Sequence, residues 1–428
     1  MRQMKKILVL FPKEWDRLEF ERPEYRGRYE FVYAGFDLFR FPQNAQLATF
    51  DVFRFVNRLL ERFRKERLDG VISNNEHFGA PIAAVLAEKL GLPGNDPRVV
   101  ITAQHKFYAR QAFAQIAPEA AARCAVFPYA LRRREDLPFE LPCFVKPVRA
   151  TYSVLARRVE RFDELQRHLA FWPFEKWVIK RLVKPFNDLM RWYTDYALDA
   201  HHLIAEEILP GVQVNMDGYV HEGSVHVLGV VDENMYPGTS AFCSFEYPSR
   251  VPAEAQAKMT ALAAKLLAGM GYRHGFFNLE FSWDPASGRI AVIELNPRMA
   301  SQLSYVYECV DGVRPYEALL ALATGDAPPA IAVASRFSHA ASFALRKFDG
   351  RPLAAHPTAE QLARARHEFP EAQLMLYLKR GASLTREMKW LGSYRYAVVN
   401  MAATSQQALY ERFRAFARRL FLTSDLPA

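Results

Sequence analysis

Two short segments near residue 280 alternate between apolar and polar side chains, which is typical of a β-strand with one buried face. Residues 276–283 alternate Phe and Leu with Asn, Glu and Ser. Residues 289–296 place Ala291, Ile293 and Leu295 on one face and Val292, Glu294 and Asn296 on the other. The five residues between them, Asp-Pro-Ala-Ser-Gly, have the composition of a turn. The pattern therefore predicts a β-hairpin whose two strands share an apolar face.

The polar face of this hairpin carries two carboxylates that the turn brings together. Folding the chain here places Glu280 opposite Glu294 and Asn278 opposite Asn296. At ~5 Å and an effective dielectric of ~20, two such carboxylates repel each other by roughly 3 kcal/mol. Protonation of one group, splaying of the side chains into water, or a cation between them relieves this repulsion.

The composition of the polar face favours the cation. Asn296 adds a further oxygen to those of Glu280 and Glu294, and no Cys or His stands at ligand spacing. Oxygen ligands alone favour Mg²⁺ or Mn²⁺, and Mg²⁺ is commonly shared with the phosphates of a nucleotide. We therefore expect Glu280, Glu294 and Asn296 to be metal ligands. The alternative is a solvated strand face with two incidental glutamates.

The N-terminal hundred residues alternate between strand-like and helix-like patterns. Apolar runs predict strands at 5–11, 29–34 and 70–73, and apolar residues at helical spacing predict helices at 51–68 and 81–90. This alternation is typical of a parallel α/β unit. A polar cluster at 74–77 follows the last strand, where ligands gather in open α/β sheets, although an ordinary surface loop has the same composition.

The C-terminal part of the chain mixes strands and helices differently. Residues 214–220 and 225–231 form a second candidate hairpin, and strand-like patterns recur at 338–348 and 394–401. A final helix is expected at 404–421, where Thr404 and Gln407 have the spacing of a capping box.

Composition narrows the class of protein. The chain has 428 residues, of which 50% are apolar and 24% charged, as in globular proteins of several domains. No apolar run approaches ~20 residues, so we expect no membrane helix. The four cysteines lie far apart, which fits a reducing cytoplasm. A net charge of +9 is spread along the chain, which suits an anionic substrate better than nucleic acid.

The hairpin that ends in Glu-Leu-Asn-Pro-Arg resembles the magnesium signature of the ATP-grasp ligases, a superfamily that includes biotin carboxylase, the large chain of carbamoyl-phosphate synthetase and amino-acid ligases. Similar stretches follow the family order from about residue 70 to about 325. The resemblance implies an α/β chain with α+β lobes: a pre-ATP-grasp domain at 1–100, an ATP-grasp domain at 101–330 with a small mobile lobe at about 126–200, and an α+β extension at 331–428. The extension is expected to pack on the ATP-binding lobe or to form a homodimer contact.

The resemblance also implies the nucleotide site. Lys106, on a helix expected to begin near residue 102, and Lys146, at the end of a strand, match the lysines that contact the nucleotide phosphates. Arg298 matches the arginine at the γ-phosphate and the acyl-phosphate, where a permanent planar cation suits the growing charge. We expect Lys146 and Arg298 to act in catalysis.

The hinge strand and a loop of small residues complete the expected site. By position, Glu206, Glu207 and Ile208 fall in the hinge that holds the adenine and ribose, and Gln213 stands where relatives often have Glu. The loop at 148–153 departs from the family because it contains no glycine. Its small residues, Ser153 among them, are expected to let the backbone approach the phosphates.

The function implied is an ATP-dependent carboxylate–amine ligase that requires Mg²⁺. It would form an acyl-phosphate, release ADP and phosphate, and act on small-molecule carboxylate and amine substrates of an amino-acid or peptide-like kind. An ATP-grasp kinase or carboxylase is an alternative. The glycine-free loop leaves open a further one, a nucleotide-binding scaffold without catalysis.

Overall fold

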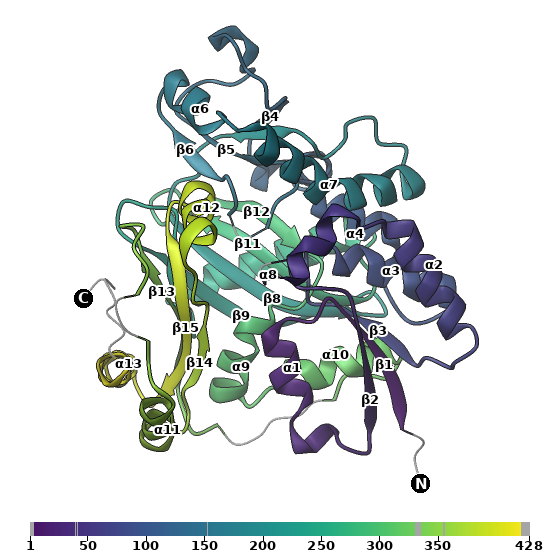
Figure 1. The fold of residues 1–428 in the computed structure, drawn as a ribbon, viewed down its shortest axis with the longest axis vertical. Coiled ribbons are helices and arrows are strands. Elements are labelled where there is room, and N and C mark those ends of the chain that lie inside the picture. Colours follow the sequence, from purple (N-terminus) through teal and green to yellow (C-terminus); the bar gives the residue numbers. More distant parts are fainter. Residues whose placement is uncertain are drawn as a thin grey trace.

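The computed structural model of the chain describes residues 4–38, 40, 42–151, 153–329, 335–353 and 356–420. The described strands form three sheets, each serving a different part of the molecule (Figure 1). Helices and strands are both abundant, which confirms the α/β class. No helix within these ranges is long and apolar enough to span a bilayer.

The N-terminal part is built on a parallel sheet in the order β2-β1-β3. Its strands and helices are β1 (Lys5–Leu10), α1 (Glu14–Phe20), β2 (Tyr29–Ala34), α2 (Val52–Phe63), β3 (Gly70–Ile72), α3 (Gly79–Leu90) and α4 (Pro97–Gln104). Apolar residues of α2 and α3 cover one face of the sheet, as the sequence predicts. The other face is covered by α10 (Pro315–Ala323), from far along the chain.

The close contact between β3 and α10 requires glycine at position 70. A Cβ atom at Gly70 would lie 2.7 Å from the carbonyl oxygen of Ala323, so only glycine lets β3 approach α10 this closely. This contact anchors the N-terminal sheet to the segment that follows Arg298.

A small lobe stands at the top of Figure 1 and contains a four-stranded antiparallel sheet in the order β4-β7-β5-β6. It is formed by β4 (Cys124–Phe127), β5 (Cys143–Pro147), β6 (Arg157–Val159), α6 (Phe162–His168), α7 (Pro173–Tyr193) and β7 (Leu203–Glu206). The lobe has a core of its own, which includes Val145, Leu165 and Leu203. This core makes the lobe a separate packing unit above the large sheet.

The largest sheet is antiparallel, with eight strands in the order β12-β11-β8-β9-β10-β13-β15-β14. Its strands are β8 (Val212–His221), β9 (Ser224–Met235), β10 (Phe242–Tyr247), β11 (Gly275–Trp283), β12 (Ile290–Asn296), β13 (His339–Lys347), β14 (Gln373–Leu376) and β15 (Tyr394–Ala403). The pairing of β10 with β13 joins the last hundred residues to the sheet. The extension therefore packs on the large sheet of the same chain.

Helices cover both faces of this sheet. One face is packed by α5 (Lys106–Ile116) and α8 (Ala253–Gly269) at one end, and by α11 (Ala359–Glu368) and α13 (Gln406–Arg419) at the other. The opposite face is packed in part by α9 (Ser304–Asp311) and carries polar residues at its centre. Helix α12 (Gly381–Leu391) leads into β15.

The predicted hairpin is present, with one irregularity. Glu280 lies opposite Glu294 and Asn278 opposite Asn296, as predicted. The register then shifts at Ile293, so that Phe281 faces Val292. A β-bulge adds one residue to one strand and reverses the faces beyond it. The prediction that Ala291 and Ile293 lie with Leu295 on the apolar face is therefore wrong, since Val292 occupies that core.

Two helix boundaries also differ from the sequence prediction. The helix expected to start near residue 102 is two helices, α4 and α5, separated at His105, whose backbone is extended. The final helix takes Ser405 as its N-cap, with the Ser405 hydroxyl accepting from the backbone N–H of Ala408, so the Thr404 capping box is wrong. The expected helix end at residue 421, like Tyr152 and the boundary at 330–331, lies outside the described residues.

The packing of α13 generates a stability prediction. Phe413 is fully buried and its ring stacks on Phe343 of β13 at 3.9 Å between centroids. Replacing Phe413 by Ala removes this contact and leaves a cavity, so the expected cost is about 3–5 kcal/mol of unfolding free energy. Urea unfolding measures the cost, and the exposed Arg418→Ala on the same helix is the control. Equal effects of the two substitutions would contradict this account of the packing.

Candidate active site

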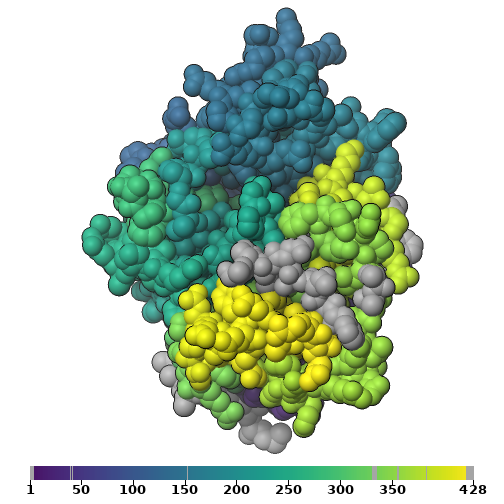
Figure 2. Space-filling model, turned by 90° about the vertical axis from the view of Figure 1, so that its left-hand side faces the viewer, coloured from purple at the N-terminus to yellow at the C-terminus, as the bar shows by residue number. Residues whose placement is uncertain are grey.

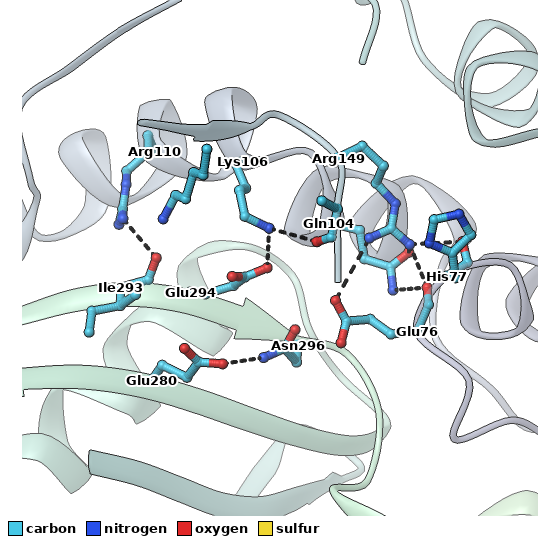
Figure 3. A network of polar contacts seen from close by, with 12 residues as sticks. Glu76, His77, Gln104, Lys106, Arg110, Arg149, Glu280, Ile293, Glu294 and Asn296 are labelled. Carbon is cyan, nitrogen blue, oxygen red and sulfur yellow. Dashed lines mark hydrogen bonds and ion pairs between the residues drawn. The ribbon is translucent and has the colours of Figure 1, made fainter. Parts of the chain in front are cut away.

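The centre of the site is the pair of opposed carboxylates, and a lysine lies against it. The Lys106 Nζ atom lies 2.6 Å from Glu294 Oε1 and donates at 3.2 Å to the carbonyl of Ala150 (Figure 3). The break at His105 makes Lys106 the first residue of α5. The ammonium group of Lys106 thus relieves part of the carboxylate repulsion in the structure.

The second carboxylate is relieved in a different way. Burial and the neighbouring Glu294 raise the pKa of Glu280 to about 7. Its oxygens accept from the side-chain amides of Asn296 at 3.1 Å and Gln213 at 3.2 Å. The structure therefore brings together the three expected metal ligands and Gln213.

The polar face continues across the sheet to carboxylates that the sequence analysis did not select. Asn278 donates to Asn215 and Asp217 on β8, and Asn215 donates to Glu233 on β9. Burial and the nearby Glu280 raise the pKa of Glu233 well above its usual range. Its Oε2 atom is buried without a hydrogen-bond partner among the described residues. Alternation on β8, where Asn215 and Asp217 alternate with Val214 and Met216, is the sequence signal for this face.

This donor set fits a divalent cation of the magnesium type. It offers carboxylate and amide oxygens, it carries more negative charge than the adjacent Lys106 neutralises, and it leaves one buried carboxylate oxygen unsatisfied. A site in which the protein supplies only some of the oxygen ligands suits Mg²⁺, which commonly takes its remaining ligands from phosphates and water. In the described part of the chain, no three His, Cys, Asp or Glu side chains form a complete metal site.

Lys146 is held by the hinge strand. Its Nζ atom lies 2.7 Å from Glu206 Oε2, and Arg110 Nε donates to the other oxygen of Glu206 at 2.7 Å. Burial acts to raise the pKa of Glu206, but Arg110 and Lys146 outweigh it and hold the pKa at about 2. Burial lowers the pKa of Lys146 against the attraction of Glu206.

Arg110 connects this pair to the hairpin of β11 and β12. Besides Glu206, its guanidinium donates to the backbone carbonyls of Val292 and Ile293, at the bulge of β12 (Figure 3). The bulge therefore presents two carbonyls to one cation, which joins β7 to the hairpin. Arg110 lies one helical turn after Lys106, and the sequence analysis did not select it.

Arg298 lies against a residue of the N-terminal domain. Its Nη2 atom donates to Glu76 Oε2 at 2.6 Å, and the Arg149 guanidinium lies 3.8 Å from the other oxygen of Glu76. Burial acts to raise the pKa of Glu76, but Arg298, Arg149 and Lys106 outweigh it and hold it at about 2. The polar cluster at 74–77, for which a surface loop was the alternative, thus brings a buried carboxylate to the site.

Three expected nucleotide-binding residues lie apart from these contacts. Glu207 pairs with Arg289 at 2.8 Å on the outer side of the hinge. Ile208 follows the end of β7, and Ser153 is exposed in the loop after β5. The structure brings neither Ser153 nor Glu207 into contact with the lysines.

Comparison with known proteins fits this arrangement. Residues 139–305, which contain Lys146, the hinge and the hairpin, match the ATP-grasp domain family. The chain carries an ATP-grasp domain. A 100-residue segment is 33% identical to carnosine synthase 1 of Gallus gallus and spans 23% of this chain. The matched segment spans 10% of the length of that relative.

Solved structures show the same ATP-grasp fold over nearly the whole chain. An L-amino acid ligase from Bacillus licheniformis superposes with a TM-score of 0.67 at 17% identity, covering 98% of each chain. The carboxyaminoimidazole ribonucleotide synthase of Aspergillus clavatus, solved with ATP, gives 0.67 at 16% identity and covers 98% of this chain and 99% of its own. At these identities the similarity establishes the fold.

The buried Asp217 generates a prediction about pH. Burial raises its pKa to about 6, against the hydrogen bonds from Tyr307 and Asn278. Between pH 4 and 6 the folded protein therefore binds more protons here than the unfolded chain. The unfolding free energy should fall as pH rises through this window, by up to about 3 kcal/mol for this group.

Asp217→Asn should remove this dependence. Urea unfolding at pH 4.5 to 7.5 would then show the variant gaining stability over the parent protein as pH rises through 6. Asp195→Asn is the control, since the Asp195 side chain is fully exposed. A difference between Asp217→Asn and the parent that stays constant across this range would contradict the pKa.

Proposed function

We propose that this chain is an ATP-dependent carboxylate–amine ligase that works through an acyl-phosphate. The observation that carries the proposal is the convergence of Lys106, the Glu280–Glu294 pair and Arg298 from three segments around one buried polar face. The ATP-grasp domain supports a nucleotide as the ligand of these cations and carboxylates.

In this reaction a substrate carboxylate attacks the γ-phosphate of ATP, and ADP leaves. The amine substrate then attacks the acyl carbon, and phosphate leaves as the C–N bond forms. The chain itself supplies positioning and charge stabilisation, so no protein nucleophile is required. Glu280, Glu294 and Asn296 would hold Mg²⁺, which neutralises phosphate charge when bound.

The cations of the site have separate roles. Lys106 and Lys146 hold the phosphates, and in the structure they are paired with Glu294 and Glu206. Arg298 stabilises the transferring phosphoryl group, and in the structure it is paired with Glu76. Each cation is thus kept in place by a carboxylate.

The substrate class follows from relatives alone. Carnosine synthase and L-amino acid ligase are names of proteins that join amino acids, so amino-acid or peptide-like substrates are proposed for this chain. The protein is proposed to work in the cytoplasm.

A product assay tests the reaction type. The protein is incubated with ATP, Mg²⁺ and pairs of amino acids, and ADP, phosphate and the mass of the product are measured. Release of ADP that needs both a carboxylate and an amine, with a product of the dipeptide mass, is the expected result. Release with an alcohol acceptor would support a kinase, release that requires bicarbonate a carboxylase, and ATP binding without release a scaffold. AMP with pyrophosphate would contradict the acyl-phosphate route.

Substitution of the opposed carboxylates tests the site. Glu280→Gln and Glu294→Gln preserve shape but remove charge from the expected metal ligands, so turnover should fall about 100-fold or more, and Mg²⁺-dependent ATP affinity with it. Calorimetry of ATP binding with and without Mg²⁺ measures the second effect. Glu254→Gln is the control, because the Glu254 side chain is 82% exposed on α8. Unchanged affinity and turnover in both site variants would reject the assignment.

A further inference from the structure

The loop between β5 and β6, residues 148–156 without Tyr152, has an unusual backbone for a segment with no glycine. Ser153 has φ of 54° and Leu155 has φ of 59°, both in the left-handed region that side chains with a Cβ disfavour. Such conformations persist only where the surroundings hold them. We call this segment the phosphate loop, and its stability needs an explanation outside the loop.

The first part of the phosphate loop is held by the active site. Lys106 donates through its backbone N–H to the carbonyl of Val148 at 3.2 Å and through Nζ to the carbonyl of Ala150. Arg149 is buried and donates to the carbonyls of Glu76 and His77. These contacts fix residues 148–150 beside the carboxylate pair.

The last part of the phosphate loop is held by the C-terminal extension. The backbone N–H of Leu155, one of the two left-handed residues, donates to the carbonyl of Trp390 at 2.9 Å. The ring of Trp390 packs against the core of the small lobe. Beside it, Lys389 Nζ lies 2.6 Å from Glu175 at the start of α7. Figure 2 shows the C-terminal segment, in yellow, against the small lobe, in blue.

Lys389 and Trp390 lie in the last turn of α12, which is packed against the rest of the extension. Helix α12 packs Leu384 and Met388 into the core of the extension and ends at Gly392, whose φ is 69°. Strand β15 begins two residues later, at Tyr394, and pairs with β13, which pairs with β10. The large sheet is thus joined to the phosphate loop through β13, β15 and α12.

We infer that Lys389 and Trp390 are positioning residues that hold the phosphate loop in its left-handed conformation and so set the affinity for the ATP phosphates. This rests on the proposed function, since it takes ATP as the ligand above Lys106 and Lys146. In this chain a contact from α12 replaces the conformational freedom that glycine gives a phosphate loop. A contact that holds the loop in its binding conformation lowers the entropy cost of binding.

A charge exchange across the Lys389–Glu175 pair tests the inference. Lys389→Glu places two carboxylates together and should weaken ATP binding about tenfold, the change that a coupling of ~1.4 kcal/mol gives. The double variant Lys389→Glu with Glu175→Lys restores opposite charges and should recover most of the affinity. Lys258→Glu is the control for the charge change, because Lys258 forms an exposed pair with Glu254 within α8. Calorimetry with ATP and Mg²⁺ measures the affinities.

Hydrogen exchange of the nucleotide-free protein gives a second readout. Peptides that contain Leu155 should exchange faster in Lys389→Glu than in the parent protein, and the double variant should return towards the parent rate. Exchange in Lys389→Glu equal to that of the parent would overturn the inference, whether or not ATP binds. Failure of the parent protein to bind ATP would instead overturn the proposed function, so the two failures are distinguishable.

Discussion

The repulsion between Glu280 and Glu294 is the constraint on which the rest of the site depends. A turn and two alternating strands force these carboxylates to face each other on a buried sheet. Two features of the structure reduce this repulsion: the ammonium of Lys106 lies against Glu294, and the pKa of Glu280 is raised to about 7. The same acidic face extends across β8 and β9 to Glu233 and Asp217, whose pKa values burial also raises.

Other charged groups of the site are arranged in the same way, as cations held by carboxylates from a different segment. Lys146 and Arg110 meet on Glu206, and Arg298 and Arg149 meet on Glu76. Such pairs keep long side chains in defined positions within a buried site, where an unpaired charge would cost several kcal/mol. A ligand that carries anionic groups and a bound cation can take the place of these partners. Its anionic groups would replace the carboxylates beside the lysines and arginines, and its cation would replace the ammonium beside a carboxylate. Binding would then exchange charge pairs rather than create new ones.

The sequence predicted those features that local patterns encode. Alternation and turn composition were sufficient to place Glu280 opposite Glu294, and strand–helix alternation predicted the N-terminal sheet. The bulge at Ile293 was missed because residues 290–293 are all apolar, so the shift of the alternation from one face to the other leaves no mark in the sequence. The break at His105 was missed because the residues on both sides favour helix. The partners of Lys106, Arg110 and Glu76 lie roughly 100 to 220 residues away, and no local pattern determines such contacts.

The addition of β13 to β10 has a consequence for any shortened form of this protein. With the last hundred residues removed, β10 would become an outer strand with a row of open N–H and C=O groups. A bare outer strand of this kind recruits other chains. The extension therefore also protects the edge of this sheet from pairing with other chains. A fragment trimmed to the matched domain would need charged residues or proline on β10 to avoid aggregation.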